Sequence, residues 1–456
     1  MSHSESGSAS RRVERRDTPA RSPVLAWALW DCGSTGLNAI VGTFVFTVYL
    51  TDRVGQSPAG GTSPESWLGR TLAIAGLAIA VLAPVLGVWV ESPRRRRVVL
   101  GGLTSLVVTL TASMSLIRDD PRYLLPGLAL LAATVASSDL ASVPYNAMLR
   151  QFCTPQTAGR ISGFGWAAGY VGSVLLLVVV YLGFMSGTGP ARGLLRLPTQ
   201  DGWNVRATML MTAAWLALFA LPLLLFAHRL PESGPQTGPV SPPPMSMLGG
   251  YRKLWLDITA EWRRDRNLVY FLVASAVFRD GLAAMFVFGA VLGVNVYGLS
   301  QADVLVFGVA ACVVAALGAV VGGLIDHRIG SKRVIVGSLT AIIAMALTLL
   351  ALSGPLAFWV CALLLCLFIG PSQSSSRALL LQMAQHGKEG VAFGLYTMTG
   401  RAVSFLAPWM FSVFVDVFHA VRAGLGGVCL VLILGLLLML RVRVGRHGGA
   451  VAAEPI

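Results

Sequence analysis

The feature that most constrains this chain is the length of its apolar runs. The segments 72–90 and 428–440, with their flanks, give apolar stretches of about 20 residues, the length of an α-helix that crosses a bilayer. Lipid offers no partner for a free backbone N–H or C=O, so these runs must be helical, and the short alternating segments of a membrane β-barrel are absent. Charged residues make up only 12% of the sequence, roughly half the share in a soluble domain. The sequence therefore predicts an all-α protein embedded in a lipid bilayer.

Apolar runs of this kind recur along the whole chain. We predict 12 transmembrane helices in two six-helix bundles, separated by a longer polar segment. The predicted spans are 24–50, 67–90, 98–117, 123–148, 161–185, 208–227, 268–297, 301–325, 334–352, 356–378, 391–415 and 421–440.

The polar segments complete the predicted organisation. A linker helix with aromatic and basic residues at helical spacing fits the membrane interface, and it also fits a helix packed on the bundle. The predicted order is a disordered cytoplasmic tail (1–22), an N-terminal bundle (23–228), a cytoplasmic linker with this interfacial amphipathic helix (229–266), a C-terminal bundle (267–441) and a cytoplasmic tail (442–456).

The net charge of +14 is distributed unevenly between the two sides of the membrane. When the spans alternate in direction, 25 Lys and Arg residues fall on the side that holds both termini and 8 on the other side. This bias predicts that both termini are cytoplasmic. We expect the protein to reside in the plasma (inner) membrane. Membrane topology accounts for the positive charge, so we expect no nucleic-acid partner.

Sequence motifs of catalysis and of metal binding are missing. The six cysteines lack metal-ligand spacing, and the sequence has no phosphate-binding Gly-x4-Gly-Lys-[Ser/Thr] loop. It also lacks a helical His/Glu metal pair and a nucleophile elbow. We therefore expect neither enzyme activity nor a metal or cofactor.

The two halves of the chain repeat one another. Residues 146–173 align without a gap with residues 377–404, at an offset of 231, and the alignment pairs Gly159 with Gly390. Both stretches cover the end of one span, a loop and the start of the next span. Parallel halves of six spans, with the substrate bound between them, are a common plan of secondary transporters.

A second repeated motif lies in the basic loops after spans 2 and 8. The later copy reads Gly-x-x-x-Asp followed by basic residues, whereas in the earlier copy Glu91 replaces Asp and Arg94 stands where Gly is expected. This pattern resembles the signature of the major facilitator superfamily, whose members pair such groups across a cytoplasmic gate. The alternative is that these residues only direct membrane topology. The resemblance implies a gate motif of Gly87, Glu91, Gly322, Asp326, Arg328, Lys332 and Arg333.

Longer stretches are similar to the vacuole effluxer-like branch of that superfamily. They cover residues 26–50, 143–173, 278–293 and 370–408, spread over most of the length of the chain. The resemblance implies the major facilitator fold and, from the eukaryotic members, amino-acid efflux from the vacuole. The tetrapeptide 144–147 also resembles cation-coupled sugar symporters of the superfamily, so a sugar or glycoside substrate stays open.

Ionisable residues inside the predicted spans are the candidate transport residues, because a charge within the membrane is costly. In the first span an aspartate is followed by a threonine and an asparagine at helical spacing, which makes one polar stripe. The predicted substrate and coupling cavity comprises Asp31, Thr35, Asn38, Asp139, Arg279, Asp280 and Arg401.

These charges could instead form structural ion pairs between buried helices. Arg279 and Asp280 are adjacent and point about 100° apart, so they need separate partners, and Arg401 is available for Asp280. Arg401 also suits the carboxylate of an anionic or zwitterionic substrate, because its forked guanidinium is always charged. Asp31 suits a coupling proton, since a carboxylate partly removed from water can exchange a proton near neutral pH.

Together these features predict a secondary active transporter that works by alternating access. We expect a small-molecule substrate, such as an amino acid or another small zwitterion or anion, a proton (or sodium) as the coupling ion, and a monomeric protein. Two alternatives are a cation-coupled sugar or glycoside symporter and a membrane sensor or scaffold that transports nothing.

Overall fold

The computed structural model describes residues 21–55, 64–154, 157–187, 189–226, 252, 259, 266–299, 301–385 and 387–443. The predicted N-terminal tail, apart from its last two residues, lies outside the described residues. The predicted amphipathic helix of the linker and nearly all of the C-terminal tail lie outside them as well.

The N-terminal half begins with a long, irregular first span. In this span α1 (Arg21–Asn38) runs into the π-helical turn Ala39–Phe44, then α2 (Phe46–Tyr49) and a second π-helical turn, Leu50–Val54. The remaining helices of this half are α3 (Pro64–Trp89), α4 (Pro93–Ser113), α5 (Leu124–Ala147), α6 (Leu149–Phe152), α7 (Ala158–Val180) and α8 (Trp203–Phe226). A two-stranded antiparallel hairpin, β1 (Ala191–Arg192) and β2 (Leu197–Pro198), lies between α7 and α8, with Ala191 opposite Pro198.

The C-terminal half repeats this plan, and three of its helices have 29 or 30 residues. Its helices are α10 (Arg266–Asn295), α11 (Gln301–Ile329), α12 (Ser331–Ala351), α13 (Pro355–Met383), α14 (Glu389–Val403), α15 (Leu406–Phe418) and α16 (Ala423–Arg441). The eleventh span is broken between α14 and α15. Pro408 explains the break, because it has no N–H for the carbonyl of Ser404 and its ring crowds that carbonyl.

Twelve segments of the described chain are long and apolar enough to cross a membrane, from Ser22–Val54 to Ala423–Arg441. The predicted all-helical, twelve-span fold is therefore confirmed. Large apolar side chains such as Ile74 and Leu77 point outward, each 67% exposed, as expected for positions that face lipid.

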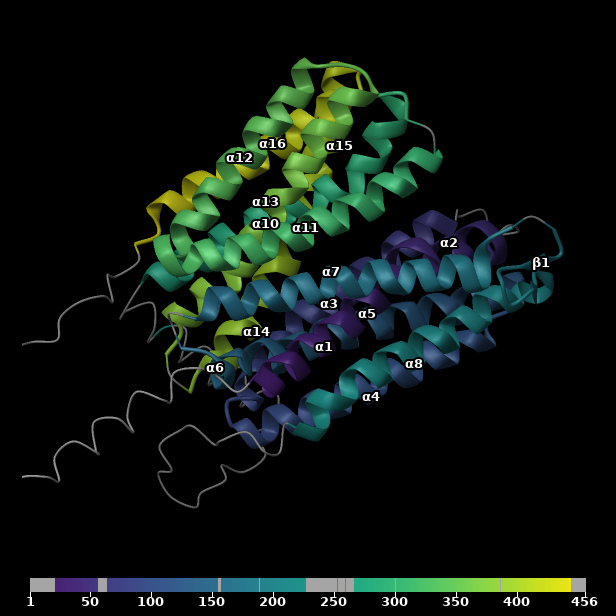
Figure 1. Cartoon of the computed structure of the whole chain (residues 1–456), viewed down its shortest axis with the longest axis horizontal. Coiled ribbons are helices and arrows are strands. Elements are labelled where there is room, and N and C mark those ends of the chain that lie inside the picture. Colours follow the sequence, from purple (N-terminus) through teal and green to yellow (C-terminus); the bar gives the residue numbers. More distant parts are fainter. Residues whose placement is uncertain are drawn as a thin grey trace, which may run out of the picture.

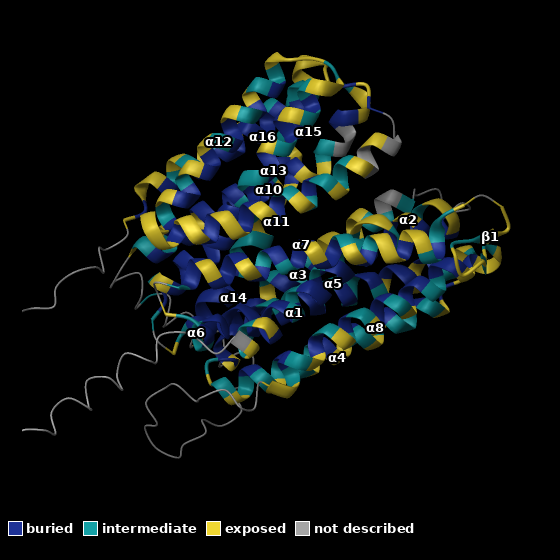
Figure 2. Cartoon of the chain, viewed as in Figure 1, coloured by how far each residue is buried: buried dark blue, intermediate teal, exposed yellow. Residues whose placement is uncertain are grey.

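Figure 1 shows the two halves as separate bundles, α1 to α8 and α10 to α16. They lie together at the end where α6 and the start of α14 meet, and they diverge toward the end that holds α2 and β1. The helices that touch across the halves are mainly α7 with α11, α3 with α14, and α13 with α7. Buried residues fill the interior of each bundle and the end where the bundles meet (Figure 2). We call this the closed end.

Candidate functional site

A carboxylate from the C-terminal half is held at the closed end by two arginines from the N-terminal half. The carboxylate of Glu389, the first residue of α14, lies 2.8 Å from Nη2 of Arg96 and 2.9 Å from Nε of Arg150. The backbone N–H of Gly387 donates to the same carboxylate at 3.0 Å. The side chains of Arg96 and Glu389 are only 4% and 2% exposed, so this pair is shielded from water. Such charge-assisted bonds in a dry site join the halves firmly.

The gate motif predicted from the sequence contributes less directly to this cluster. Glu91 offers its backbone carbonyl to Nη2 of Arg96 at 3.1 Å, while the carboxylate that binds Arg96 comes from Glu389. Sequence reasoning missed Glu389, which lies just before the predicted eleventh span. The repeat gave no signal for it, because the equivalent position in the first half is Ala158.

The second copy of the motif places one acid at the interface and its basic residues elsewhere. Asp326 is buried, accepts a hydrogen bond from Oγ of Ser331 at 2.9 Å, and packs against Gly159 of α7. Lys332 donates to the carbonyls of Leu440 and Val442 in its own half. Arg328 and Arg333 are exposed.

Glycines allow the backbones of the two halves to touch at the closed end. A Cβ on Gly87 of α3 would lie 3.0 Å from the carbonyl carbon of Gly390 and 3.1 Å from Cα of Val391. A Cβ on Gly163 of α7 would collide with the backbone of Ala319 in α11. Gly322 instead packs on Pro371 within its own half. Of the two predicted gate glycines, Gly87 therefore lies between the halves and Gly322 does not.

Arg377 of α13 reaches into the N-terminal half. Its Nη2 lies 3.2 Å from Oδ2 of Asp31, and its Nη1 donates to Oδ1 of Asn146 at 2.6 Å. The guanidinium carbon lies 5.7 Å from the ring centre of Trp27, 6.0 Å from that of Tyr145 and 5.0 Å from that of Trp166.

The predicted span 356–378 ends one residue after Arg377, and the charge count included this arginine among the 25 on the side that holds the termini. That placement was wrong, because α13 continues to Met383 and keeps the arginine inside the membrane-spanning segment. The internal repeat relates Arg377 to its hydrogen-bond partner. Asn146 and Arg377 are equivalent positions, 231 residues apart, and so are Arg150 and Leu381, whose Nη1 and carbonyl oxygen lie 3.4 Å apart. Equivalent residues of a two-fold arrangement meet where they lie near its axis.

The polar side chains of the first span have different hydrogen-bond partners. Thr35 donates to Oδ1 of Asp31 at 3.4 Å, within the same helix. Asn38 accepts a hydrogen bond from Ser138 of α5 at 3.5 Å. Asp31 thus carries the ionic contact of the stripe, and Asn38 joins two helices of the N-terminal half.

A second ion pair within the spans joins Arg401 of α14 to Asp139 of α5. The two side chains are 35% and 24% exposed, so they are more accessible than Arg377, whose side chain is 6% exposed. The neighbouring hydroxyls of Thr397 and Ser404 donate to carbonyls of their own span, those of Phe393 and Arg401.

The adjacent charges of α10 have separate partners, as expected, but Arg401 is not one of them. Arg279 donates to the carbonyl of Tyr396 at 3.2 Å, and its guanidinium carbon lies 3.8 Å from the centre of the Tyr396 ring. Asp280 accepts a hydrogen bond from the backbone N–H of Ala407 at 2.6 Å. These contacts fix the two pieces of the broken eleventh span against α10.

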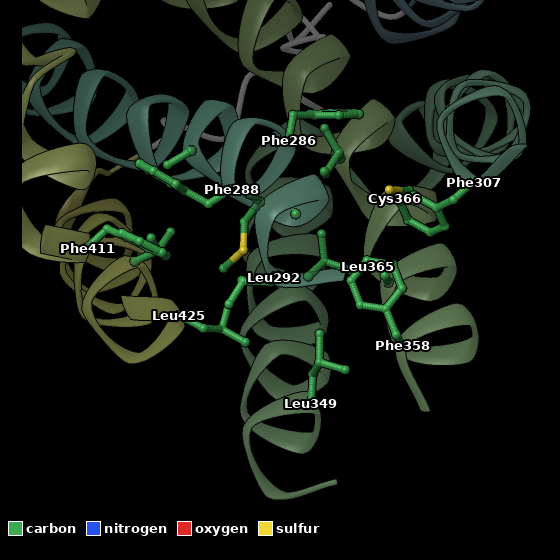
Figure 3. Close-up of a pocket in the computed structure, with 16 residues that line it drawn as sticks. Phe286, Phe288, Leu292, Phe307, Leu349, Phe358, Leu365, Cys366, Phe411 and Leu425 are labelled. Carbon is green, nitrogen blue, oxygen red and sulfur yellow. The ribbon is translucent and has the colours of Figure 1, made fainter. Parts of the chain in front are cut away.

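An apolar pocket lies inside the C-terminal half, between α10, α11, α12, α13, α15 and α16. Figure 3 shows the rings of Phe288 and Phe411 side by side, and their centres are 3.9 Å apart. No charged side chain lines this pocket in the part of the chain that the structure describes. It can accept an apolar group only.

Comparison with known proteins agrees with this architecture. The family model described as "Vacuole effluxer Atg22 like" matches residues 63–451. The uncharacterised MFS-type transporter YxiO of Bacillus subtilis is 22% identical over 390 residues, which cover 85% of this chain and 87% of that protein.

A fungal protein matches part of the chain, and a solved structure shares its fold. Autophagy-related protein 22 of Yarrowia lipolytica is 25% identical over 320 residues, 63% of this chain, and the match spans 51% of that protein. The chain thus spans about half the length of this fungal relative. A solved structure of the major facilitator superfamily proton:xylose symporter XylE superposes with a TM-score of 0.69 at 16% identity, over 92% of this chain and 95% of that one. This chain is an integral membrane protein of the vacuole effluxer family, a branch of the MFS-type transporters, which are not enzymes.

Proposed function

We propose that this transporter moves a small zwitterion of the amino-acid type by alternating access, driven by a proton gradient. One observation carries the proposal. Two ion pairs deep in the described spans, Arg377–Asp31 and Arg401–Asp139, each join a cation of one half to an anion of the other. Separation of the halves splits both pairs, and an unpaired charge within the membrane is costly. A zwitterion provides a carboxylate for the arginine and an ammonium for the aspartate.

The Arg401–Asp139 pair is the better substrate site of the two. Its side chains are partly exposed, whereas Arg377 is enclosed. The guanidinium of Arg401 can hold a carboxylate through two parallel hydrogen bonds. Asp139 then offers its carboxylate to the substrate ammonium. The substrate would thus replace the contact between the halves with two contacts of its own.

The closed end is the gate in this proposal. The Glu389 cluster and the Gly87 contact hold the halves together there. With both termini in the cytoplasm, as the charge bias predicts, this conformation is open to the outside and shut to the cytoplasm. Asp31 is the proposed proton site, since its only cationic partner in the described structure belongs to the half that moves away.

Transport by the purified full-length protein in liposomes tests this function. We would measure uptake of individual labelled amino acids, and of xylose as a sugar control, with and without a pH gradient across the membrane. The proposal requires saturable uptake of at least one amino acid that the gradient increases. Saturable uptake of xylose alone would support a sugar symporter, and no saturable uptake of any solute would support a sensor or scaffold.

A further inference from the structure

Arg377 occupies a cage that is built entirely by the other half of the protein. The cage consists of the Asp31 carboxylate and the rings of Trp27, Tyr145 and Trp166, which belong to α1, α5 and α7. Its floor is rigid, because Tyr145 stacks on Trp27 with ring centres 4.7 Å apart and also stacks on another tryptophan of α1. A carboxylate beside several aromatic faces is the chemistry that binds organic cations.

The cage offers more polar groups than Arg377 uses. The Tyr145 hydroxyl lies near Asp31 and Arg377, and Tyr145 is 1% exposed. The indole N–H of Trp166 and the Nε–H of Arg377 are buried without an acceptor among the described residues. Buried polar groups without partners are rare, and here they gather around one cation site.

Arg377 belongs to the C-terminal half and the cage to the N-terminal half, and these halves must separate during transport. Ser162 of α7 donates to the carbonyl of Ser374, three residues before Arg377, at 2.8 Å, so α13 is seated on the N-terminal half at this level. Alternating access requires this contact to open, which would withdraw Arg377 and leave Asp31 without its cation. This step rests on the proposed function.

We propose that the cage formed by Asp31, Trp27, Tyr145 and Trp166 is a binding site for an ammonium or guanidinium group of the substrate. Arg377 fills the cage while the closed end is shut. The cationic group of the substrate fills it when that end is open. Substrates with a cationic side chain are therefore preferred over neutral ones of the same shape.

Arginine and citrulline separate this site from the zwitterion site. They share the same amino-acid group and nearly the same shape, and only arginine carries a cationic side chain. We would measure binding of labelled L-arginine and L-citrulline to the purified full-length protein. Arginine should bind more tightly. Arg377→Gln removes the cationic side chain that fills the cage in the natural protein. If the cage of the natural protein is empty about a tenth of the time, this variant should bind arginine about tenfold more tightly and citrulline with unchanged affinity.

Three further variants make the test specific. Arg377→Lys keeps a cation in the cage and should bind arginine like the natural protein. Asp31→Asn should abolish the preference for arginine. Trp166→Leu keeps the ion pair and should weaken arginine binding several-fold. Trp215→Leu should not, because the Trp215 ring packs on Phe219 and is not one of the three rings around Arg377.

Equal binding of arginine and citrulline by both the natural protein and Arg377→Gln would overturn the cage. If Arg377→Gln does not fold, Trp166→Leu decides the test. An arginine preference in Trp166→Leu as strong as in the natural protein would also overturn the cage. Uptake of neutral amino acids in liposomes is measured separately. If that uptake is present while arginine and citrulline bind alike, the cage is wrong and the proposed function stands.

Discussion

The half that supplies the arginine differs between the ion pairs of the interface. Within the spans the arginine comes from the C-terminal half, in the pairs Arg377–Asp31 and Arg401–Asp139. At the closed end the C-terminal half supplies the carboxylate, Glu389. Each pair is therefore satisfied only when the halves are together. Ion pairs that form together and break together favour two discrete conformations over a continuous range of conformations.

The sequence singled out three of these charges but not their pairing. Asp31, Asp139 and Arg401 are recognisable because charges stand out in apolar spans. Their partners depend on which helix faces meet across the halves, and the spacing of residues along one helix does not contain that information. Glu389 and Arg377 were missed for a related reason, since both lie near a helix end, where a charge is easily assigned to a loop.

Glu389→Gln should open the closed end. The amide cannot neutralise Arg96, which stays buried, and loss of one member of a buried pair costs on the order of 3–5 kcal/mol. We would place a cysteine at Ser162, which is buried between the halves, in a variant without the native cysteines. A thiol reagent should then label it faster in Glu389→Gln than in the matched Asp416→Asn variant, whose acid is exposed. An unchanged labelling rate would argue against the gate.

Arg401→Lys should weaken substrate affinity. A single ammonium cannot form the two parallel hydrogen bonds of a guanidinium, so we expect a loss of about tenfold, or roughly 1.4 kcal/mol. Equilibrium binding of the transported amino acid measures the effect. Arg279→Lys is the control, because Arg279 contacts Tyr396 of its own half and should lower thermal stability more than affinity. The opposite ranking would assign the substrate site to Arg279.

At the level of whole helices, α7 uses two faces of one glycine-rich segment. Gly163 lets it approach α11 of the other half, while Gly165 and Gly169 face Trp27 and Thr35 of α1. The glycine-rich sequence of this segment permits close helix contacts, since small residues let backbones approach. It did not distinguish contacts between the halves from contacts within one half.

Gly87→Ala should prevent the closed end from shutting. The added methyl group would meet the backbone of Gly390 and Val391, where nothing can move aside without shifting α14, and overpacking of this kind costs about 1–3 kcal/mol. Gly76 of the same helix has open space on this side, with no atom within 4 Å of the place that a Cβ would take, so Gly76→Ala is the matched control. Uptake in liposomes and labelling at Ser162 should change in Gly87→Ala alone. Equal behaviour of the two variants would show that α3 and α14 need not touch.

For the whole molecule, hydropathy and the internal repeat were enough to predict the fold. Twelve spans follow from the apolar runs, and the 231-residue offset relates the two halves, whereas the contact of Asn146 with Arg377 is seen only in the structure. The break in the eleventh span was not predicted, although Pro408 is its cause. Which end of the molecule is shut could not be predicted either, because one sequence has to encode both conformations.

The sidedness of the molecule is open to a direct test. Arg94, Arg160, Arg328 and Arg441 all lie at helix ends on the closed side of the molecule, which the charge bias predicts to be cytoplasmic. A single cysteine at Ser353, exposed in the loop before α13, should react with an impermeant reagent in intact cells. One at Thr237, in the linker, should react only after lysis. The reverse pattern would invert the topology.

Coupling to the proton gradient is a property of the whole cycle, and Asp31 is where we expect it to arise. When the halves separate at the closed end, Asp31 loses Arg377, and a proton can replace the lost positive charge. Asp31→Asn needs no such replacement, because an amide is neutral in both conformations. The variant should therefore exchange a labelled neutral amino acid for the unlabelled one across the liposome membrane at equal pH, but should not accumulate it when a pH gradient is imposed. Asp416→Asn, an exposed acid, should do both. Normal accumulation by Asp31→Asn would move the coupling site elsewhere, and loss of this neutral exchange as well would show that Asp31 is needed for more than coupling and the binding of a cationic side chain.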